Sequence, residues 1–303
     1  MLSATVERHI ALHHATGYLF RKQSCLLRGF ARYAGSKGDD LVRAATAVEW
    51  AGLGPTVATC HGRLEVVRRF ARLVQAEDPR HEIPPAGVFG GRPRRRTPYI
   101  FSAEDIRALL KAAAALGPRR SLRPQAYVTM LGLIAATGLR ISEALALRLS
   151  DVTGAGLVVR ETKFRKSRLV PLHPTTRAAL DAYLHAREKH AVVDDAVFLS
   201  EWRRRMSYST VITTFLSLVR RVGIHPGPGK PGPRIHDLRH TFAVRSLEEC
   251  VGNRDAVTRH AFALSTYLGH AHVADTYWYF QATPALLADI AKQGESLAKR
   301  GLR

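Results

Sequence analysis

Four short motifs hold cationic and phenolic side chains that could act together on a phosphodiester. They are Thr-Gly-Leu-Arg-Ile-Ser-Glu at 137–143, His-Asp-Leu-Arg-His at 236–240, Leu-Gly-His at 268–270 and Thr-Tyr-Trp-Tyr at 276–279. A phosphodiester anion resists nucleophiles, and guanidinium groups bind its oxygens as planar donors that stay charged. A tyrosine phenol can attack phosphorus and form a covalent phosphotyrosine. The set therefore predicts phosphodiester cleavage and rejoining.

The two arginines and the first histidine are the expected anion-binding groups. Arg140 and Arg239 each lie at a turn-to-helix junction, where a side chain can meet helix N-terminal amides on an anion. His236 lies three residues before Arg239 and shares its helical face. His236 can therefore donate to a phosphoryl oxygen or transfer a proton.

Tyr279 is the candidate nucleophile. Tyr277 and Tyr267 compete for this role, and either could equally be a core aromatic residue. Lys163 lies in a basic turn and could protonate the leaving 5′ oxygen, with Lys166 as its nearest rival. The alternative for Lys163 is a solvated turn lysine that only contacts a backbone phosphate.

Three further residues are expected around this site. His270 follows a glycine and is either a turn residue or a catalytic donor, whereas His240 is expected to pack or to support the site. Glu143 lies one helical turn beyond Arg140 and is expected to orient it. The sequence has no carboxylate cluster for two divalent metals and no glycine-rich nucleotide-binding loop. No metal or other cofactor is therefore expected.

The charge of the chain favours a polyanionic partner over the alternative of a merely arginine-rich proteome. Lys and Arg number 46 against 25 Asp and Glu, which gives a net charge of +21. Each phosphate that such cations neutralise releases a counterion, which favours nucleic acid. Two basic segments supply the candidate DNA-binding residues, and the first segment has a solvated linker as its alternative. These residues are Arg92, Arg94, Arg95, Arg96, Arg165, Lys166 and Arg168.

Cysteine usage and hydropathy point to a cytoplasmic protein, and the expected DNA partner would place it at the nucleoid. Cys25, Cys60 and Cys250 show no paired spacing, which argues against a zinc site or a disulfide framework. The N-terminus lacks a signal-peptide pattern, and the longest apolar run, 126–136, is too short to span a bilayer. No membrane partner is expected.

Apolar spacing predicts a mainly α fold with a small antiparallel β-sheet. The expected helices cover 6–15, 22–33, 41–51, 56–76, 102–115, 122–136, 141–147, 174–189, 207–222, 237–250, 261–268 and 284–297. Asp39 and Asp40 are expected at a helix start. Two β-rich runs within 155–172 predict a hairpin. Proline and glycine punctuation divides the chain into a helical domain over 1–80, a linker over 81–98 and a second domain over 99–303.

The motifs, in their order and neighbourhoods, resemble those of the tyrosine recombinase (phage integrase) family. The family's catalytic positions are matched by Arg140, Lys163, His236, Arg239, His270 and Tyr279. The resemblance implies a SAM-like core-binding bundle followed by an integrase-type catalytic domain. It also implies site-specific recombination through a 3′-phosphotyrosyl intermediate. Four subunits would act on two double-stranded DNA sites, with 284–297 as a contact between subunits.

One departure from the family pattern bears on the biological role. The interval from Arg239 to His270 is several residues longer than usual in the family, which predicts an inserted loop within 245–263. This feature, together with Tyr277 beside Tyr279, resembles recombinases of transposons and other mobile elements. Integration, excision or transposition is the expected role, with an accessory recombinase or a DNA-bending protein as a further partner. The alternatives are a chromosome-dimer or plasmid resolvase, a telomere resolvase or topoisomerase with the same chemistry, and a DNA-binding protein that does not cleave.

Overall fold

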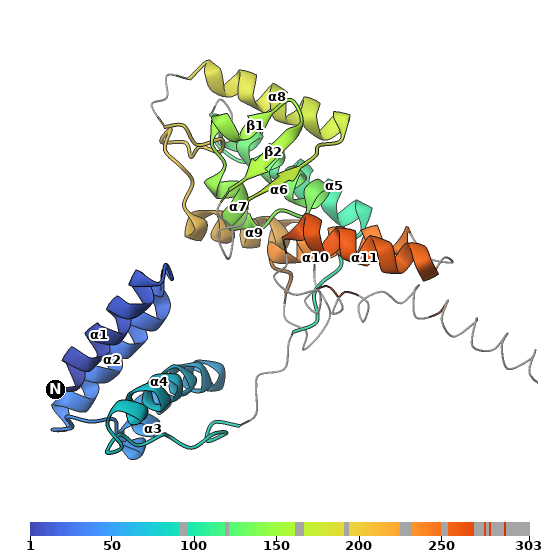
Figure 1. Cartoon of the computed structure of the whole chain (residues 1–303). Coiled ribbons are helices and arrows are strands. Elements are labelled where there is room, and N and C mark those ends of the chain that lie inside the picture. Colours follow the sequence, from blue (N-terminus) through green and yellow to red (C-terminus); the bar gives the residue numbers. More distant parts are fainter. Residues whose placement is uncertain are drawn as a thin grey trace, which may run out of the picture. The chain divides into compact units, whose positions relative to one another are not determined.

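The computed structural model forms two compact units, Met1–Arg96 and Thr97–Arg303, which are described separately (Figure 1). The structure describes residues 1–90, 96–118, 121–160, 167–190, 194–224, 232–249, 254–269, 276, 279 and 288. Several residues named above lie outside this part of the chain. They are Arg92, Arg94, Arg95, Lys163, Arg165, Lys166, Cys250, His270 and Tyr277, and the same holds for nearly all of the expected helix 284–297.

The first unit is a bundle of four helices, as the apolar spacing predicts. They are α1 (Leu2–Ala15), α2 (Arg21–Ser36), α3 (Ala44–Gly52) and α4 (Val57–Glu77). Helices α1 and α2 run side by side, and α2 also contacts α3 and α4 (Figure 1). Fully buried Val6, Phe30 and Phe70 contribute to a single apolar cluster. Burial of this shared face stabilises helices that would be marginal alone.

Helix α3 begins at Ala44, so the helix start expected at Asp39 and Asp40 is wrong. The amide of Ala44 donates to the Glu82 carboxylate at 2.8 Å, so a distant residue supplies the cap. Asp39 instead accepts from the Thr46 hydroxyl at 2.5 Å, and Asp40 pairs with the N-terminal amine. A cap that is distant along the chain leaves no signal in the local sequence.

Residues 81–90 belong to the helical unit, although the sequence places them in a linker. The Val42 amide donates to His81 Nδ1 at 3.0 Å, and the Glu82 amide donates to the Val42 carbonyl at 2.9 Å. Arg68 donates to the Pro84 carbonyl at 2.8 Å. The prolines prevent a helix here, but these hydrogen bonds attach the extended chain to the bundle. The unit therefore continues beyond residue 80.

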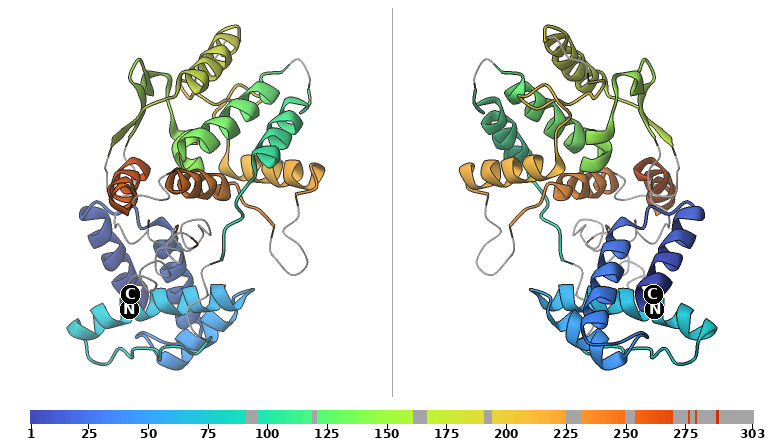
Figure 2. Two further views of the ribbon diagram at one scale, coloured as in Figure 1. Left: turned by 90° about the vertical axis from the view of Figure 1, so that its right-hand side faces the viewer. Right: turned by 90° about the vertical axis from the view of Figure 1, so that its left-hand side faces the viewer.

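The second unit combines seven α-helices, within the described residues, and a small sheet. The helices are α5 (Ala103–Ala114), α6 (Arg123–Thr137), α7 (Ile141–Ala146), α8 (Pro174–Glu188), α9 (Tyr208–Arg221), α10 (His236–Glu248) and α11 (Arg254–Leu268), with a 3-10 turn η1 (Leu149–Asp151). Helix α8 lies at one end of the unit, and α10 and α11 lie at the other (Figures 1 and 2). No helix in the described ranges is long and apolar enough to cross a membrane.

The sheet is antiparallel, with strand order β1-β2-β3. The strands are β1 (Val152–Thr153), β2 (Gly156–Val159) and β3 (Arg168–Val170). The expected hairpin is confirmed as β2 and β3, whereas the two-residue strand β1 was not expected. Gly156 begins β2 with φ 138°, and a Cβ there would lie 2.3 Å from the Val170 carbonyl oxygen. Only glycine permits this close approach.

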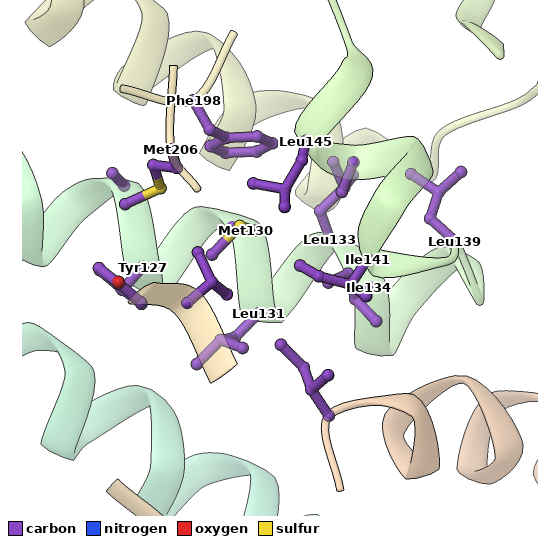
Figure 3. Packing of buried hydrophobic residues seen from close by; sticks show 14 of the residues in the cluster. Tyr127, Met130, Leu131, Leu133, Ile134, Leu139, Ile141, Leu145, Phe198 and Met206 are labelled. Atoms are coloured by element: carbon purple, nitrogen blue, oxygen red, sulfur yellow. The ribbon is translucent and has the colours of Figure 1, made fainter. Parts of the chain in front are cut away.

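Helix α6 runs through the core of the second unit. Its buried side chains pack against Leu139, Ile141, Leu145, Phe198 and Met206 (Figure 3). These α6 residues include Tyr127, Met130, Leu131, Leu133 and Ile134. A helix that is apolar on several faces is buried rather than amphipathic. Because the core holds α6 firmly, the turn that follows it is a rigid place for a functional side chain.

Helices α10 and α11 contact each other, and they contain most of the interval in which an inserted loop was expected. The described part of this interval is mostly helical, because α10 continues to Glu248 and α11 begins at Arg254, whereas residues 250–253 lie outside the described residues. The apolar residues Ala261, Leu264 and Leu268 recur at helical spacing and share a buried cluster with residues of α10. Burial of this stripe favours helix over loop. The described part of the interval thus lies almost entirely in two helices that contact each other, and the inserted loop stays a prediction.

Candidate active site

The turn between α6 and α7 positions Arg140. Gly138 ends α6 in the left-handed conformation, with φ 63°. A Cβ on Gly138 would lie 2.5 Å from the Phe242 ring and 2.9 Å from Leu268. Arg140 then precedes α7 in an extended conformation, and its amide donates to the Glu143 carboxylate at 2.9 Å. The glycine therefore lets α10, α11 and this turn meet closely.

We expect Gly138→Ala to lower the free energy of unfolding by about 2–4 kcal/mol, because it adds left-handed strain to overpacking. Urea denaturation measures the change. Gly132→Ala is the matched control in α6, since its Cβ would meet only Leu110 at an ordinary 3.9 Å. We expect the control to be neutral or to stabilise by up to about 1 kcal/mol. Equal losses in both variants would contradict the tight turn.

The Arg140 guanidinium lies at the C-terminal end of α11. It donates to Glu143 Oε1 at 2.6 Å, to the Leu268 carbonyl at 3.4 Å and to the Gly269 carbonyl at 3.2 Å. Its side chain retains 26% exposure. Arg140 is therefore fixed by the protein but still open to an incoming anion.

Arg239 is buried beside Arg140. Its guanidinium, in a residue that is 1% exposed, donates to the Gly138 carbonyl at 2.7 Å and to the Leu268 carbonyl at 2.8 Å. Both arginines thus share the Leu268 carbonyl. Burial, and then the charge of Arg140, lower the pKa of Arg239 to about 10, so it remains a cation at neutral pH. Two adjacent cations, one buried and one partly exposed, favour a bound anion.

His236 lies in the first turn of α10, one helical turn before Arg239. Burial, and then the charges of Arg239 and Arg140, lower the pKa of His236 to about 4. The imidazole is therefore neutral at physiological pH and offers one N–H donor. Its ring meets the buried ring of His240 edge-on, with centroids 4.7 Å apart. His240 thus packs behind His236.

Tyr279 lies within the same group of residues. It is 3% exposed and packs in the apolar cluster of α10 and α11. Its ring centroid is 5.4 Å from that of His240. The ionised phenol would raise the pKa of Arg239, so it lies within electrostatic reach of that guanidinium. The side chains from 140, 236, 239 and 279 are therefore brought together, as the expected chemistry requires.

Tyr267, the described competitor of Tyr279, has a different environment. It stacks on Phe242 with centroids 5.6 Å apart, and burial raises its pKa. Its carbonyl accepts a hydrogen bond from Arg168. These contacts indicate a packing residue.

Arg168 differs from its expected role as a DNA contact. Its guanidinium donates to Glu143 Oε1 and Oε2 at 3.1 and 2.8 Å and to the Tyr267 carbonyl at 2.7 Å. Its side chain is 13% exposed. Burial tends to raise the pKa of Glu143, but Arg168 and then Arg140 outweigh it and hold that pKa at about 2. The donors of Arg168 are thus used inside the protein, where its charge stabilises Glu143.

The backbone supplies part of the site that the sequence did not predict. The carbonyls of Gly138, Leu268 and Gly269 orient the two arginines. Their only sequence signal is the glycine in Thr-Gly-Leu-Arg and in Leu-Gly-His.

Arg96, the last residue of the first unit, is partly buried. Within the described ranges, no group of three His, Cys, Asp or Glu residues could hold a metal ion.

Comparison with known proteins identifies the fold and the relatives of this chain. The Phage integrase family model matches residues 100–285. A putative integrase/recombinase, y4rB of Sinorhizobium fredii, is 37% identical over 300 residues, covering 96% of each chain. Tyrosine recombinase XerD of Caulobacter vibrioides is 34% identical over 258 residues, covering 82% of this chain and 78% of its own. The structure of the Tn1549 transposon integrase, solved with transposon right-end DNA, has a TM-score of 0.68 at 17% identity. The match covers 97% of this chain and 99% of that chain.

The chain therefore belongs to the phage integrase family, the tyrosine recombinases. It is a tyrosine-type DNA recombinase with the integrase fold. The relatives include both integrases and Xer recombinases, so this assignment covers more than one biological role.

Proposed function

We propose that this chain cleaves double-stranded DNA through Tyr279 and passes the strand on through a 3′-phosphotyrosyl intermediate. The observation that carries the proposal is the convergence on α10 and the end of α11. Arg140 and Arg239 share the Leu268 carbonyl there, and the Tyr279 phenol lies within electrostatic reach of Arg239. A phosphate at the two guanidinium groups would have a nucleophile beside it.

In the proposed reaction, the Tyr279 phenol gives up its proton to water, and its oxygen forms a bond to phosphorus as the bond to the 5′ oxygen breaks. Arg140, Arg239 and neutral His236 donate to the non-bridging oxygens. The leaving 5′ oxygen takes a proton from Lys163, a role that follows the family resemblance together with that of His270 as a further donor. The 5′ hydroxyl of a partner strand then attacks the phosphotyrosine and gives its proton back to Lys163, while the Tyr279 oxygen leaves and takes up a proton from water. Each preorganised donor to the non-bridging oxygens contributes about 10²–10³-fold to the rate of cleavage.

The proposed biological role is integration, excision or transposition of a mobile element. Whole-length similarity to a putative integrase/recombinase supports it, as does the fold shared with a transposon integrase. Four subunits would act on two DNA sites in the cytoplasm, at the nucleoid, with an accessory recombinase or a DNA-bending protein as partner. Resolution of chromosome dimers or plasmids is the second candidate, because XerD relatives match most of the chain.

Nicked suicide substrates test the cleavage. Duplexes tiled across the DNA that flanks the gene, each nicked beside a candidate phosphate, are incubated with the full chain. We expect a covalent complex that survives denaturant and yields a phosphotyrosine peptide with the nucleotide on Tyr279. Binding without any covalent complex would favour the alternative of a DNA-binding protein that does not cleave. Recombination of element ends rather than of a chromosomal dimer site would separate the two biological roles.

We also propose that Arg92, Arg94, Arg95 and Arg96 contact the DNA backbone. Replacing all four by glutamine should weaken binding to every sequence. The plot of log association constant against log salt concentration should become flatter. The magnitude of its negative slope should decrease by up to about 3–4, since each phosphate contact contributes about 0.9. Binding titrations at several salt concentrations measure this slope.

A matched control removes four other arginines from the same unit. Arg8, Arg28, Arg43 and Arg80 each already pair with a carboxylate. Replacing these by glutamine should change the slope much less, because their charges are already compensated. An unchanged slope in the first variant would reject the backbone contact.

A further inference from the structure

Arg168 connects three parts of the site that are far apart in the sequence. It begins β3, whereas Glu143 belongs to α7 and Tyr267 to α11. Its guanidinium engages both oxygens of Glu143, and its Nε donates to the Tyr267 carbonyl. A Cβ on Gly269 would lie 2.9 Å from Arg168 Nη1, so the chain passes very close to the guanidinium. Arg168 thus connects the small sheet to α7 and to the end of α11.

The three arginines together hold the end of α11. Arg168 binds the carbonyl of residue 267, Arg140 and Arg239 bind that of 268, and Arg140 also binds that of 269. The last carbonyls of a helix have no partner within the helix, and cations are favoured there. These contacts fix the point from which the chain leads on toward position 279.

Arg168 also changes the charge available at Arg140. The buried Glu143 carboxylate accepts hydrogen bonds from the Arg140 guanidinium and from the Arg140 amide, so it competes with a phosphate for that guanidinium. With Arg140 alone, the pair would be neutral. The second arginine makes the group of Arg140, Glu143 and Arg168 net positive. Arg140 can then attract an anion while Glu143 still orients it.

We infer that Arg168 is a positioning residue for DNA cleavage, which neutralises Glu143 so that Arg140 remains available to the phosphate, and which fixes the end of α11. The inference rests on the proposed function. It predicts that Arg168 acts through Glu143 and the backbone of α11, and that it does not contact DNA itself.

The test compares Arg168→Met, Arg168→Lys, Glu143→Gln and the Arg168→Met/Glu143→Gln double variant on the nicked substrate. We expect Arg168→Met to slow covalent-complex formation by about 10²-fold, because small misplacements of reacting groups have costs of this size. DNA binding should stay within about tenfold, since a single residue is a small part of the interface. Arg168→Lys keeps the charge and should lose less activity.

The double variant separates this role from a purely structural one. A neutral amide at position 143 would no longer hold Arg140 away from the phosphate, so the double variant should cleave about tenfold faster than Arg168→Met, as coupled residues do. If the loss of cleavage rate in the double variant equals the product of the losses in the two single variants, the residues act independently and the inference is overturned. The same holds if Arg168→Met cleaves like the wild type, or if binding and cleavage fall together while the salt slope drops by about one, as for a direct phosphate contact.

Hydrogen exchange gives a readout that does not need cleavage. Amides of the peptide 264–269 should exchange faster in Arg168→Met than in the wild type. In Arg168→Lys they should exchange more slowly than in Arg168→Met. Arg177→Met is the matched control, because Arg177 likewise pairs with a carboxylate, of Asp181, and with a backbone carbonyl, of Thr153. The control should change neither exchange nor cleavage by more than about twofold, as for a surface substitution away from the site.

The two readouts keep the proposals distinct. If the wild type forms no covalent complex, the proposed function fails, and exchange alone decides whether Arg168 holds the end of α11. Unchanged exchange in Arg168→Met would overturn the positioning role in either case. If Arg168→Met does not fold, Arg168→Gln carries the comparison, because it also removes the charge, and wild-type cleavage and exchange in that variant would refute the inference.

Discussion

Replacing Tyr279 by phenylalanine is expected to abolish the covalent protein–DNA complex and to leave DNA binding unchanged. The substitution removes only the phenolic oxygen, so the ring can keep its place beside His240 and in the apolar cluster of α10 and α11. Without a nucleophile on the protein, no phosphotyrosine can form. The nicked-substrate assay should therefore show loss below detection, and thermal unfolding should show that the variant still folds cooperatively.

Two other tyrosines serve as controls for this result. Tyr267→Phe retains the stack on Phe242 and should form the complex at a rate close to the wild type. Tyr277→Phe should do so as well. A complex that persists in Tyr279→Phe and disappears in Tyr277→Phe would reassign the nucleophile.

Arg239→Ala is expected to reduce the rate of cleavage by about 10²–10³-fold, the usual effect of losing one preorganised donor to a transition-state oxygen. Site binding should stay within about tenfold, because one phosphate contact is a small part of a large interface. Arg239→Lys keeps a positive charge but not the planar pair of donors, so it should recover only part of the rate. Single-turnover cleavage with saturating protein measures the change.

The difficulty with this variant is stability, since alanine would leave the carbonyl of Gly138 without its arginine partner. Arg187 is a matched control: it is 6% exposed and also donates to two backbone carbonyls, of Ala196 and Asp194. Arg187→Ala should destabilise the fold comparably but leave cleavage per folded molecule near the wild-type rate. Equal losses of cleavage in both variants would mean that Arg239 acts through stability alone.

The local sequence predicts the elements of this chain well where a single helix or hairpin decides its own structure. The four N-terminal helices and the β2–β3 hairpin follow from apolar spacing, because burial of one face is written into each segment. The start of α3 and the attachment of residues 81–90 do not follow, since Glu82 and His81 bind residues about forty positions earlier. The sequence predicts α10 and the end of α11 but not residues 254–260, because the apolar stripe of α11 is buried against α10 rather than within its own segment.

The residue types and order of the motifs, by themselves, determined the chemistry and the family of this protein, because few reactions need guanidinium, imidazole and phenol groups together. Only the tertiary structure decided how these groups are held. It placed Arg140 and Arg239 on one carbonyl at the end of α11, and it turned Arg168 inward onto Glu143. Side-chain direction and shared backbone acceptors depend on contacts between α7, β3, α10 and α11. Such contacts arise when the elements pack together, so no local pattern in the chain encodes them.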